Sequence, residues 1–568
     1  MKLLLVESPS KCKKIKSFLG AEYQCLASVG HIVDIQQGLK GIHPETFLPS
    51  YTVKKGKKRI VQALQQQCRG VSVYLATDPD REGEAIAYHL CLFLGLCPQT
   101  TPRVRFHEIT KTAVQHAMNH PTVLDMNLVR AQQARQVLDL YVGYKVSPLL
   151  WKHIAPKLSA GRCQTPALRM LVDQERVVKD PRDLKRRLVV TADFDQGFSG
   201  CILHHPKLVS WDDVAPMIEA LSKTHCFQVL HKTTKTCRQD PPPPFITSTM
   251  QQESYHLFHL SPTHTMSVLQ TLYEKGRITY LRTDSPFLSE TAVQQCQQCI
   301  EKKFGALLFQ PRVFASSATS QEAHEAIRPT KMATETLPAG CTDLEKKLYQ
   351  CIWKRTLASQ MTTHRFTESV YTILGGEKYE FQKTSRTTLQ QGWKLVYDDD
   401  PKESSSILPD PPCTVQWMQG KVVEEVEKNK GRHSEATLIR ELEKRGIGRP
   451  STFASLGAKL LERKYASMGN VAGLSIQRQC LHLDKNFVVH PQQEKVVVGA
   501  DHGKYVVTDR GQQVLTFLQT HVPWVVENEF TGAMENELDK MARNETTYHE
   551  VVSRWFSKID NCLFSCTL

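Results

Sequence analysis

The spacing of hydrophobic and polar residues changes along the chain, and these changes predict which segments are mixed, helical or strand-rich. Near the N-terminus, the short apolar runs Leu3–Val6 and Val71–Thr77 are typical of buried strands. The pattern from Arg81 to Leu96 is helical, with Gly95 near its end. Strand, acidic turn and helix in this order predict an α/β domain with a doubly wound sheet.

Beyond this domain, helical and strand-like patterns alternate. Residues 127–177 are mostly helical, 184–230 favour strands, 248–365 are helix-rich, 368–426 return to strand-like alternation, and helices dominate from Ser434 onward. The prolines at 241–244 exclude helix and central strand, so they mark a boundary. Strand-rich segments on both sides of a helical insert predict a chain that leaves a base, climbs an arch, builds a tip and returns. The fold class expected is multidomain α/β plus α-rich, with predicted domains at 1–120, 121–183, 184–240, 241–365, 366–430 and 431–568.

Composition agrees with several globular domains and a partner rich in phosphate. The 568 residues include 72 Lys and Arg against 58 Asp and Glu, so the formal net charge is +14. A hydrophobic content of 40% excludes a mostly disordered chain. No apolar run approaches the roughly 18 residues of a membrane span, and the N-terminal apolar run is too short for a secretory signal. We therefore expect a soluble, intracellular protein without a membrane segment or signal peptide.

The 17 cysteines predict neither a disulfide framework nor a zinc ribbon. Only Cys296 and Cys299 have the C-x-x-C spacing, and a four-cysteine ribbon needs two such pairs. We expect mostly free thiols.

An acidic cluster follows the second predicted strand. Asp78, Asp80, Glu82 and Glu84 alternate with other residues, and Glu7 ends the first predicted strand. Ligand sites in open α/β sheets lie at the carboxyl ends of strands, so Glu7 and Asp78 meet if the two strands are neighbours. Several carboxylates in one place favour a hard cation such as Mg²⁺, which binds few carboxylates and keeps several waters. The alternative is a solvated acidic turn followed by carboxylates that cap a helix.

A tyrosine and an arginine lie together after a well-defined helix. Ser261 and Pro262 are good starting residues for that helix, and Gly276 ends it. In the extended segment that follows, Tyr280 and Arg282 are two residues apart and point to one side. A phenol can be a covalent nucleophile, and a guanidinium beside it can hold a phosphate. The alternative is that Tyr280 is an ordinary half-buried aromatic residue.

These motifs, taken together, resemble those of type IA DNA topoisomerases, most similar to the bacterial topoisomerase I branch. They follow one another in the order of that family and span residues 6 to 453. The matching stretches are VESPSK (6–11), SVGHIVDI (28–35), ATDPDREGEAIAYHL (76–90), RFHEIT (105–110), AQQARQVLD (131–139), SPLLW (147–151), SAGRCQTPAL (159–168), GRITYLRTDS (276–285), QEAHEAIRPT (321–330) and GIGRPSTF (446–453).

The resemblance implies a fold and a set of catalytic residues. Residues 1–120 correspond to a Toprim α/β domain, and three further domains close the chain into a toroidal ring around a hole wide enough for DNA. Tyr280 corresponds to the nucleophile, Lys11 and Arg282 to phosphate-stabilising cations, and His324 to a histidine near the nucleophile. The Mg²⁺ carboxylates correspond to Glu7, Asp78, Asp80 and Glu82.

The resemblance also implies contacts to DNA. The corresponding residues are His31, Arg135, Gln136, Asp139, Tyr144, Trp151, Ser159, Ala160, Gly161, Arg162, Cys163, Gln164, Arg282 and Arg449. Simpler interpretations stay open for His324 and for three of these DNA contacts. His324 can be a structural histidine, Trp151 core packing, 159–164 a plain loop, and Arg449 part of a helix cap. Gln136 stands where many relatives have a second arginine.

The expected activity is therefore that of an ATP-independent topoisomerase acting on DNA with single-stranded character. Tyr280 would cut one strand through a 5′-phosphotyrosyl intermediate, with Glu7 as general acid, another strand would pass, and the cut would be rejoined. Negatively supercoiled DNA would relax without a nucleotide cofactor, since we find no G-x-x-x-x-G-K-[ST] loop. A monomer is expected. A Toprim nuclease or primase-like enzyme and a catalytically silent DNA clamp are the alternatives.

Overall fold

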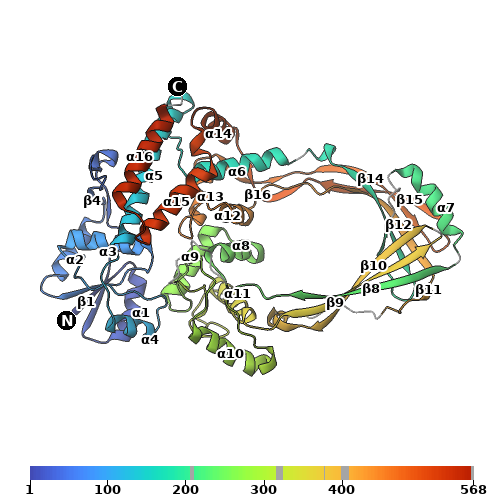
Figure 1. Cartoon of the computed structure of the whole chain (residues 1–568), viewed down its shortest axis with the longest axis horizontal. Helices are drawn as coiled ribbons and strands as arrows, with labels where there is room; N and C mark the ends of the chain where they lie inside the picture. The colour runs from blue at the N-terminus through green and yellow to red at the C-terminus, as the bar shows by residue number, and fades with distance from the viewer. Residues whose placement is uncertain are drawn as a thin grey trace.

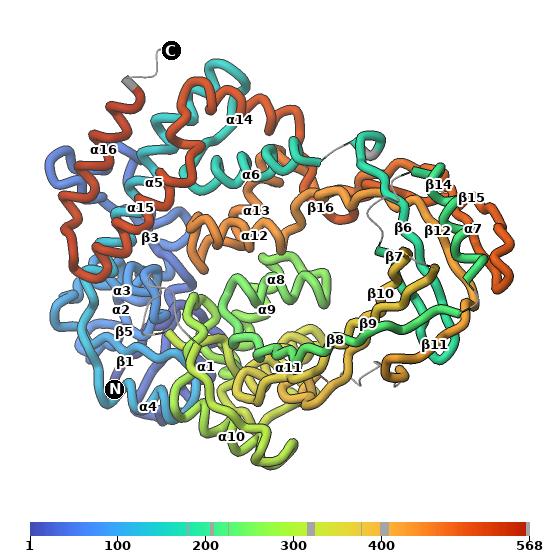
Figure 2. Tube along the Cα trace, turned by 45° about the vertical axis from the view of Figure 1, so that its right-hand side comes forward, coloured from blue at the N-terminus to red at the C-terminus, as the bar shows by residue number. Residues whose placement is uncertain are grey.

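The computed structural model describes residues 1–178, 180–204, 210–224, 226–314, 324–376, 378–397 and 408–564. The backbone forms a ring, with helices and a small α/β domain on one side and a long arch of strands on the other (Figure 1). Figure 2 shows the same opening from a second direction, between the arch strands and the helices α8 (Thr247–Phe258) and α11 (Asp343–Ser359). The predicted toroidal, multidomain α/β fold is confirmed.

The N-terminal domain is built on a three-stranded parallel sheet. Its order is β2-β1-β5, formed by Tyr23–Ala27, Lys2–Val6 and Ser72–Leu75. Both predicted strands are present and adjacent, so Glu7 and Asp78 follow neighbouring strand ends. Strand β1 is buried on both faces, as expected in a parallel sheet covered by helices. The helices are α1 (Pro9–Leu19), α2 (Lys58–Gln67), α3 (Arg81–Leu94) and α4 (Lys111–Asn119).

A buried arginine holds the turn between β5 and α3. Arg103 forms an ion pair of 2.9 Å with Glu84, and neither side chain is exposed to solvent. Arg103 also donates hydrogen bonds of 2.8 Å to the carbonyl oxygens of Thr77 and Asp78. Because buried carbonyl groups need partners, Arg103 fixes the backbone that carries Asp78.

The helical base is assembled from two distant parts of the chain. Helices α5 (Met126–His153) and α6 (Gln164–Val177) share one hydrophobic core with residues 438–559. The partners are α12 (Glu435–Lys444), α13 (Phe453–Glu462), α14 (Asp509–His521), α15 (Asn528–Ala542) and α16 (Tyr548–Phe564). This pairing agrees with the expectation that the chain returns to its base.

The arch is one nine-stranded sheet with the order β11-β8-β9-β10-β7-β6-β12-β14-β15. The strands are β6 (Arg186–Phe194), β7 (Cys201–His204), β8 (Phe227–Gln239), β9 (His364–Gly375), β10 (Tyr379–Gln390), β11 (Cys413–Val415), β12 (Trp417–Val426), β14 (Leu474–Leu483) and β15 (Val489–Val498).

Two details of the predicted arch are wrong. Helix α7 (Val214–Ser222) interrupts the segment 184–230, which was expected to favour strands. The segment from Ser434 was expected to be mainly helical, yet residues 466–507 form β13 (Ala466–Val471), β14, β15 and β16 (Asp501–Val507). Strands β14 and β15 bury few side chains, so they lack the regular hydrophobic alternation that marks a strand in sequence.

The last part of the ring carries the tyrosine segment. Helix α9 (Pro262–Glu274) begins as predicted: Ser261 caps it by accepting a hydrogen bond from the His264 amide, and Gly276 follows with φ of +64°. Helices α8 and α11 pack against it, and α10 (Glu290–Phe304) packs against α11. Leu4 and Val6 of the Toprim-like sheet lie in the same hydrophobic cluster as Tyr273 and Tyr280. The ring is therefore closed by packing between the first domain and this one.

The predictions about thiols and membrane segments can be compared with the described residues. The cysteines described by the structure are all free thiols. In the described ranges, no helix combines the length and apolar character needed to cross a membrane.

Candidate active site

The carboxylates Glu7 and Asp78 and the ammonium group of Lys11 form a buried cluster at the ends of β1 and β5. The Asp78 amide donates a hydrogen bond of 3.0 Å to Glu7 Oε1. Lys11 donates to Asp78 Oδ1 and lies 3.8 Å from Glu7 Oε2. Burial, followed by repulsion from Asp78, raises the pKa of Glu7 to about 8. Glu7 is thus a carboxylic acid that holds its proton at neutral pH.

Tyr280 belongs to the domain on the other side of the ring closure and lies against the turn Asp78–Asp80. Its side chain is 3% exposed, and its hydroxyl donates a hydrogen bond of 2.6 Å to Asp80 Oδ2. Arg282 lies beside it and donates to the same Asp80 oxygen at 3.3 Å. Burial and the charges of Asp80 and Asp78 raise the pKa of Tyr280 well above its usual value. In this closed arrangement the phenol keeps its proton.

Asp80 is ionised despite its burial. Burial alone would raise its pKa, but the Arg282 charge and hydrogen bonds from Tyr280 and the Gly83 amide lower it below the usual value. The Gly83 contact is also the N-terminal cap of α3, at 2.8 Å. One carboxylate therefore caps a helix and binds both predicted catalytic side chains.

His324 lies near the nucleophile without bonding to its hydroxyl. Its Nε2 donates a hydrogen bond of 2.9 Å to the Pro79 carbonyl oxygen, and its ring meets the Tyr280 ring edge to face at a centroid distance of 6.0 Å. His324 therefore supports the acidic turn and packs on the tyrosine. The simpler interpretation of His324 as a hydrogen-bonding structural residue agrees with these contacts. The neighbouring residues 321–323 of its motif lie outside the described residues.

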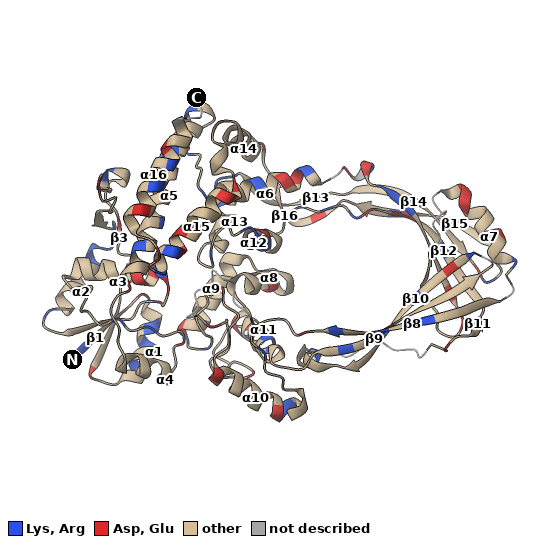
Figure 3. Cartoon of the chain, in the orientation of Figure 1, with Lys and Arg blue, Asp and Glu red and all other residues tan. Residues whose placement is uncertain are grey.

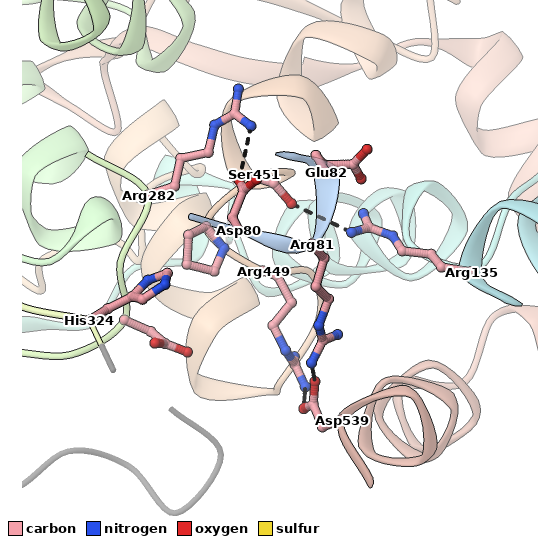
Figure 4. A pocket seen from close by; sticks show the side chains of 11 residues that line it. Asp80, Arg81, Glu82, Arg135, Arg282, His324, Arg449, Ser451 and Asp539 are labelled. Atoms are coloured by element: carbon pink, nitrogen blue, oxygen red, sulfur yellow. Dashed lines mark hydrogen bonds and ion pairs between the residues drawn. The ribbon is translucent and has the colours of Figure 1, made fainter. Parts of the chain in front are cut away.

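Glu82 is separated from the other three carboxylates. Its Oε2 lies 3.3 Å from His31 Nε2 and accepts a hydrogen bond of 3.2 Å from Gln132. In Figure 4 the Glu82 side chain points away from Asp80. Glu7 and Asp78 line one cavity, of about 490 Å³, whereas Asp80 and Glu82 line another.

The donor set at Glu7, Asp78 and Asp80 fits a hard divalent cation. All its side-chain ligands are carboxylate oxygens, and Mg²⁺ needs only one or two of them when it keeps its waters. Within the described ranges, the one group with three ligand atoms within 4.8 Å of one another lies in the arch, at Cys480, His482 and Glu494. Glu494 is already bound to Lys421 and Arg478. The active-site carboxylates are thus more widely spaced, which suits a hydrated ion.

Comparison with known proteins identifies the family. A family model described as DNA topoisomerase matches residues 123–476, and a Toprim domain model matches residues 2–109. The DNA topoisomerase 1 of Helicobacter pylori is 34% identical over 98% of this chain and 74% of that protein. The DNA topoisomerase 1 of Buchnera aphidicola is 33% identical over 99% of this chain and 66% of its own length. The solved structure of topoisomerase I from Thermotoga maritima covers 99% of this chain and 90% of its own with a TM-score of 0.84 at 32% identity.

The chain belongs to the type IA DNA topoisomerases. Its activity is that of a type I topoisomerase acting on DNA, and its first domain is a Toprim domain, a metal-binding fold. The match extends through the tyrosine segment and the first part of the helical base, which a Toprim nuclease or primase would not need.

Several residues predicted to contact DNA line two cavities next to the topoisomerase active site. His31, Glu82, Gln136 and Asp139 line a cavity of about 270 Å³, together with Lys54. Figure 4 shows the second, smaller cavity, where Arg135 and Arg449 lie with Arg282 and Asp80. Charged residues of both signs are interspersed along the helices of this region (Figure 3). These cations are therefore partly neutralised by protein carboxylates.

Tyr144 and Trp151 are on the surface of α5. Tyr144 is 53% exposed and Trp151 is 50% exposed. The Trp151 indole nitrogen donates a hydrogen bond of 2.6 Å to the Leu158 carbonyl oxygen. The simpler interpretation of Trp151 as core packing is therefore wrong, because half of its ring faces solvent.

The segment 159–164 is held firmly by the helical base. The Ser159 amide bonds to Tyr465, the Ala160 amide to Ser147 and the Gly161 amide to Thr165. Cys163 occupies the position before α6 without a side-chain capping hydrogen bond, and Gln164 is the first residue of that helix.

Arg162 is buried in the helical base, whereas the resemblance implied a contact with DNA. It is 2% exposed and bonds to Asp139 and, at 2.6 Å, to Glu535. In this closed state Arg162 supports the base and does not face a strand, so its predicted DNA contact requires a different conformation.

Two carboxylates on α15 were missed by the sequence analysis. Glu535 binds Arg162, and Asp539 binds both Arg81 and Arg449. They are one helical turn apart, which places them on one face. That spacing is common on solvent-exposed helices, so no local signal distinguished them.

The raised pKa of Glu7 predicts a pH-dependent stability difference between wild type and Glu7→Gln in metal-free buffer. Between the usual pKa near 4.5 and about 8, the folded protein keeps a proton that the unfolded chain releases, so this group weakens folding progressively as pH rises. The amide removes this effect. We expect the melting temperature of Glu7→Gln minus that of wild type to increase from pH 5 to pH 8.5 in thermal scans. A difference that is constant with pH would contradict the raised pKa.

Proposed function

We propose that this topoisomerase cuts one DNA strand with Tyr280, forms a 5′-phosphotyrosyl bond, passes another strand through the gap and rejoins the cut. The supporting observation is the juxtaposition of a buried phenol, Arg282, and the Glu7–Lys11–Asp78 cluster at the ring closure. These residues supply a nucleophile, cations for a phosphate and a protonated carboxyl in one place.

In the cutting step, the Tyr280 oxygen attacks a backbone phosphorus, and the bond from phosphorus to the 3′ oxygen breaks. The Tyr280 proton passes toward Asp80, which already accepts its hydrogen bond. The Glu7 carboxyl, protonated below about pH 8, gives its proton to the leaving 3′ oxygen. Arg282 and Lys11 stabilise the negative charge that develops on the phosphate oxygens.

The covalent bond conserves the energy of the broken phosphodiester. The freed 3′ hydroxyl attacks the phosphotyrosine, which restores the strand and the phenol. No nucleotide is consumed in this exchange, in agreement with the proposal that the enzyme needs no ATP.

We propose Mg²⁺ as the metal of this Toprim domain, held by Glu7 and Asp78 with Asp80 next to them. When bound, the ion would offset the repulsion among carboxylates and phosphate and help to orient the 3′ hydroxyl. Glu82 is a weaker candidate than the resemblance implied, because His31 and Gln132 hold it apart.

The proposed substrate is DNA with a locally single-stranded segment, as in negatively supercoiled DNA. A single strand is held mainly through its phosphates and by stacking of bases, so exposed aromatic residues and arginines suit it. Trp151 and Tyr144 supply exposed rings on α5, and Arg135 lies on the same helix. We propose that a monomer is sufficient, because one chain closes the ring by itself (Figure 1).

Tyr280→Phe tests the proposed nucleophile directly. Tyr280→Phe keeps the ring packing and removes the attacking oxygen, so covalent DNA adducts and plasmid relaxation are expected to be lost. The matched control is Tyr273→Phe, since Tyr273 is also buried and packs against Tyr280 at a centroid distance of 5.3 Å. The measurement is relaxation of negatively supercoiled plasmid, with denaturant trapping of protein on 5′ ends. Relaxation by Tyr280→Phe would overturn the proposal.

The metal assignment predicts a split between the two half-reactions. Asp78→Ala should slow rejoining more than cutting, because the metal is proposed to orient the 3′ hydroxyl and Asp78, unlike Asp80, takes no part in the proposed proton transfer. Glu82→Ala is the control, and its Mg²⁺ requirement should match wild type. Cutting is followed on mixing enzyme with a labelled oligonucleotide, and rejoining after Mg²⁺ is added to pre-formed cleavage complexes. Equal loss of both steps in Asp78→Ala would count against the metal role.

A further inference from the structure

The small cavity beside Tyr280 is lined by equal numbers of cationic and acidic side chains. The arginines are Arg81, Arg135, Arg282 and Arg449, and the carboxylates are Asp80, Glu82, Asp284 and Asp539. Its volume of about 60 Å³ is far below the roughly 300 Å³ of the smallest ligand pockets. A nucleotide therefore cannot enter unless these ion pairs rearrange.

Asp539 accepts hydrogen bonds from two of the arginines that line this cavity. Its Oδ1 accepts a hydrogen bond of 2.6 Å from Arg81, and its Oδ2 accepts one of 2.7 Å from Arg449. Its side chain is 5% exposed, so both contacts are shielded from solvent. In Figure 4 the two guanidinium groups converge on this one carboxylate.

The two arginines come from different domains. Arg81 is the first residue of α3 and directly follows the Asp78–Asp80 turn of the Toprim domain. Arg449 lies in the loop before α13 of the helical base. A carboxylate that accepts one guanidinium on each oxygen presents the same charge and the same acceptor pattern as two phosphate oxygens.

Arg81 also retains unused hydrogen-bonding capacity. Its Nε is buried and has no hydrogen-bond partner within the described part of the chain. Such a donor gains energy when an additional oxygen arrives. Arg449 also donates through Nη1 to the Gly448 carbonyl oxygen at 2.9 Å, and its Nε lies 4.0 Å from Glu535. These contacts can persist while Nη2 changes partner.

We propose that Asp539 is a positioning residue that occupies Arg81 and Arg449 in place of a DNA phosphate and releases them to the strand on entry. It keeps both arginines extended toward the cavity, and it competes with DNA for them. The inference rests on the proposed function, because it takes Arg449 to contact the strand. Its consequence is that the enzyme binds DNA less tightly than its arginines alone would allow, because the strand must displace Asp539 from both of them.

The test is the salt dependence of single-stranded oligonucleotide binding, measured by fluorescence anisotropy in the Tyr280→Phe background, which excludes cleavage. Asp539→Asn keeps the size of the side chain and removes its charge. Each additional phosphate contact steepens the slope of log affinity against log salt by about 0.7. We expect Asp539→Asn to bind roughly tenfold more tightly at low salt with the slope of the parent protein, because the same phosphates are contacted without the cost of displacing Asp539. Unchanged or weaker affinity of a folded Asp539→Asn protein would overturn the inference.

Asp501→Asn is the matched control. Asp501 is a similarly buried aspartate that accepts a hydrogen bond of 3.1 Å from Arg432, and it does not line this cavity. Its affinity for the oligonucleotide should equal that of the parent protein. Tighter binding by both variants would show a general effect of net charge and would also overturn the inference.

Arg81→Gln and Arg449→Gln keep the inference testable if Asp539→Asn does not fold. Each should reduce the slope by about 0.7, although both arginines are tied to Asp539 in the free protein. If Arg449→Gln changes nothing, the proposed DNA path is wrong. If Arg449→Gln weakens binding while folded Asp539→Asn leaves it unchanged, the path is right and the role of Asp539 is wrong.

Discussion

The hydrogen bond between Tyr280 and Asp80 joins the nucleophile to the metal-binding domain across the closure of the ring. A hydrogen bond to a charged group contributes about 1.5–3 kcal/mol, and here it is buried beside the hydrophobic cluster shared by the two domains. The same contact keeps the phenol protonated and covered. In the proposed cutting step the phenol loses its proton along this bond, so the contact that joins the two domains is lost when the covalent link to DNA forms.

The surrounding residues make this contact possible. Arg103, buried with Glu84, bonds to carbonyls of the acidic turn and so determines where Asp78 and Asp80 point. Burial separates the carboxylates chemically as well: it favours a proton on Glu7, while Arg282 keeps Asp80 ionised. One edge of the sheet thus carries a proton donor and a charged acceptor, which is the pairing that transesterification needs.

Local patterns were sufficient to predict the parts of the site that lie close in sequence. Glu7 and Asp78 follow apolar runs, and the rule for parallel sheets places both at one edge. Ser261 and Gly276 bound the helix before Tyr280 as expected. The contacts of Asp539 could not be predicted, because Arg81 and Arg449 lie far away in the chain and meet it only when the base is assembled. The burial of Arg162 depends on Glu535 for the same reason, and strands β14 and β15 lack a buried face that would reveal them.

The central claim, that Tyr280 carries the covalent link, is tested most directly by peptide mapping of the trapped complex. After cleavage complexes are denatured and digested with nuclease and trypsin, mass spectrometry should find a 5′-nucleotide on the peptide Ile278–Arg282, attached through phosphate to Tyr280. A nucleotide on any other residue, or a link to the 3′ end of the DNA, would contradict the account.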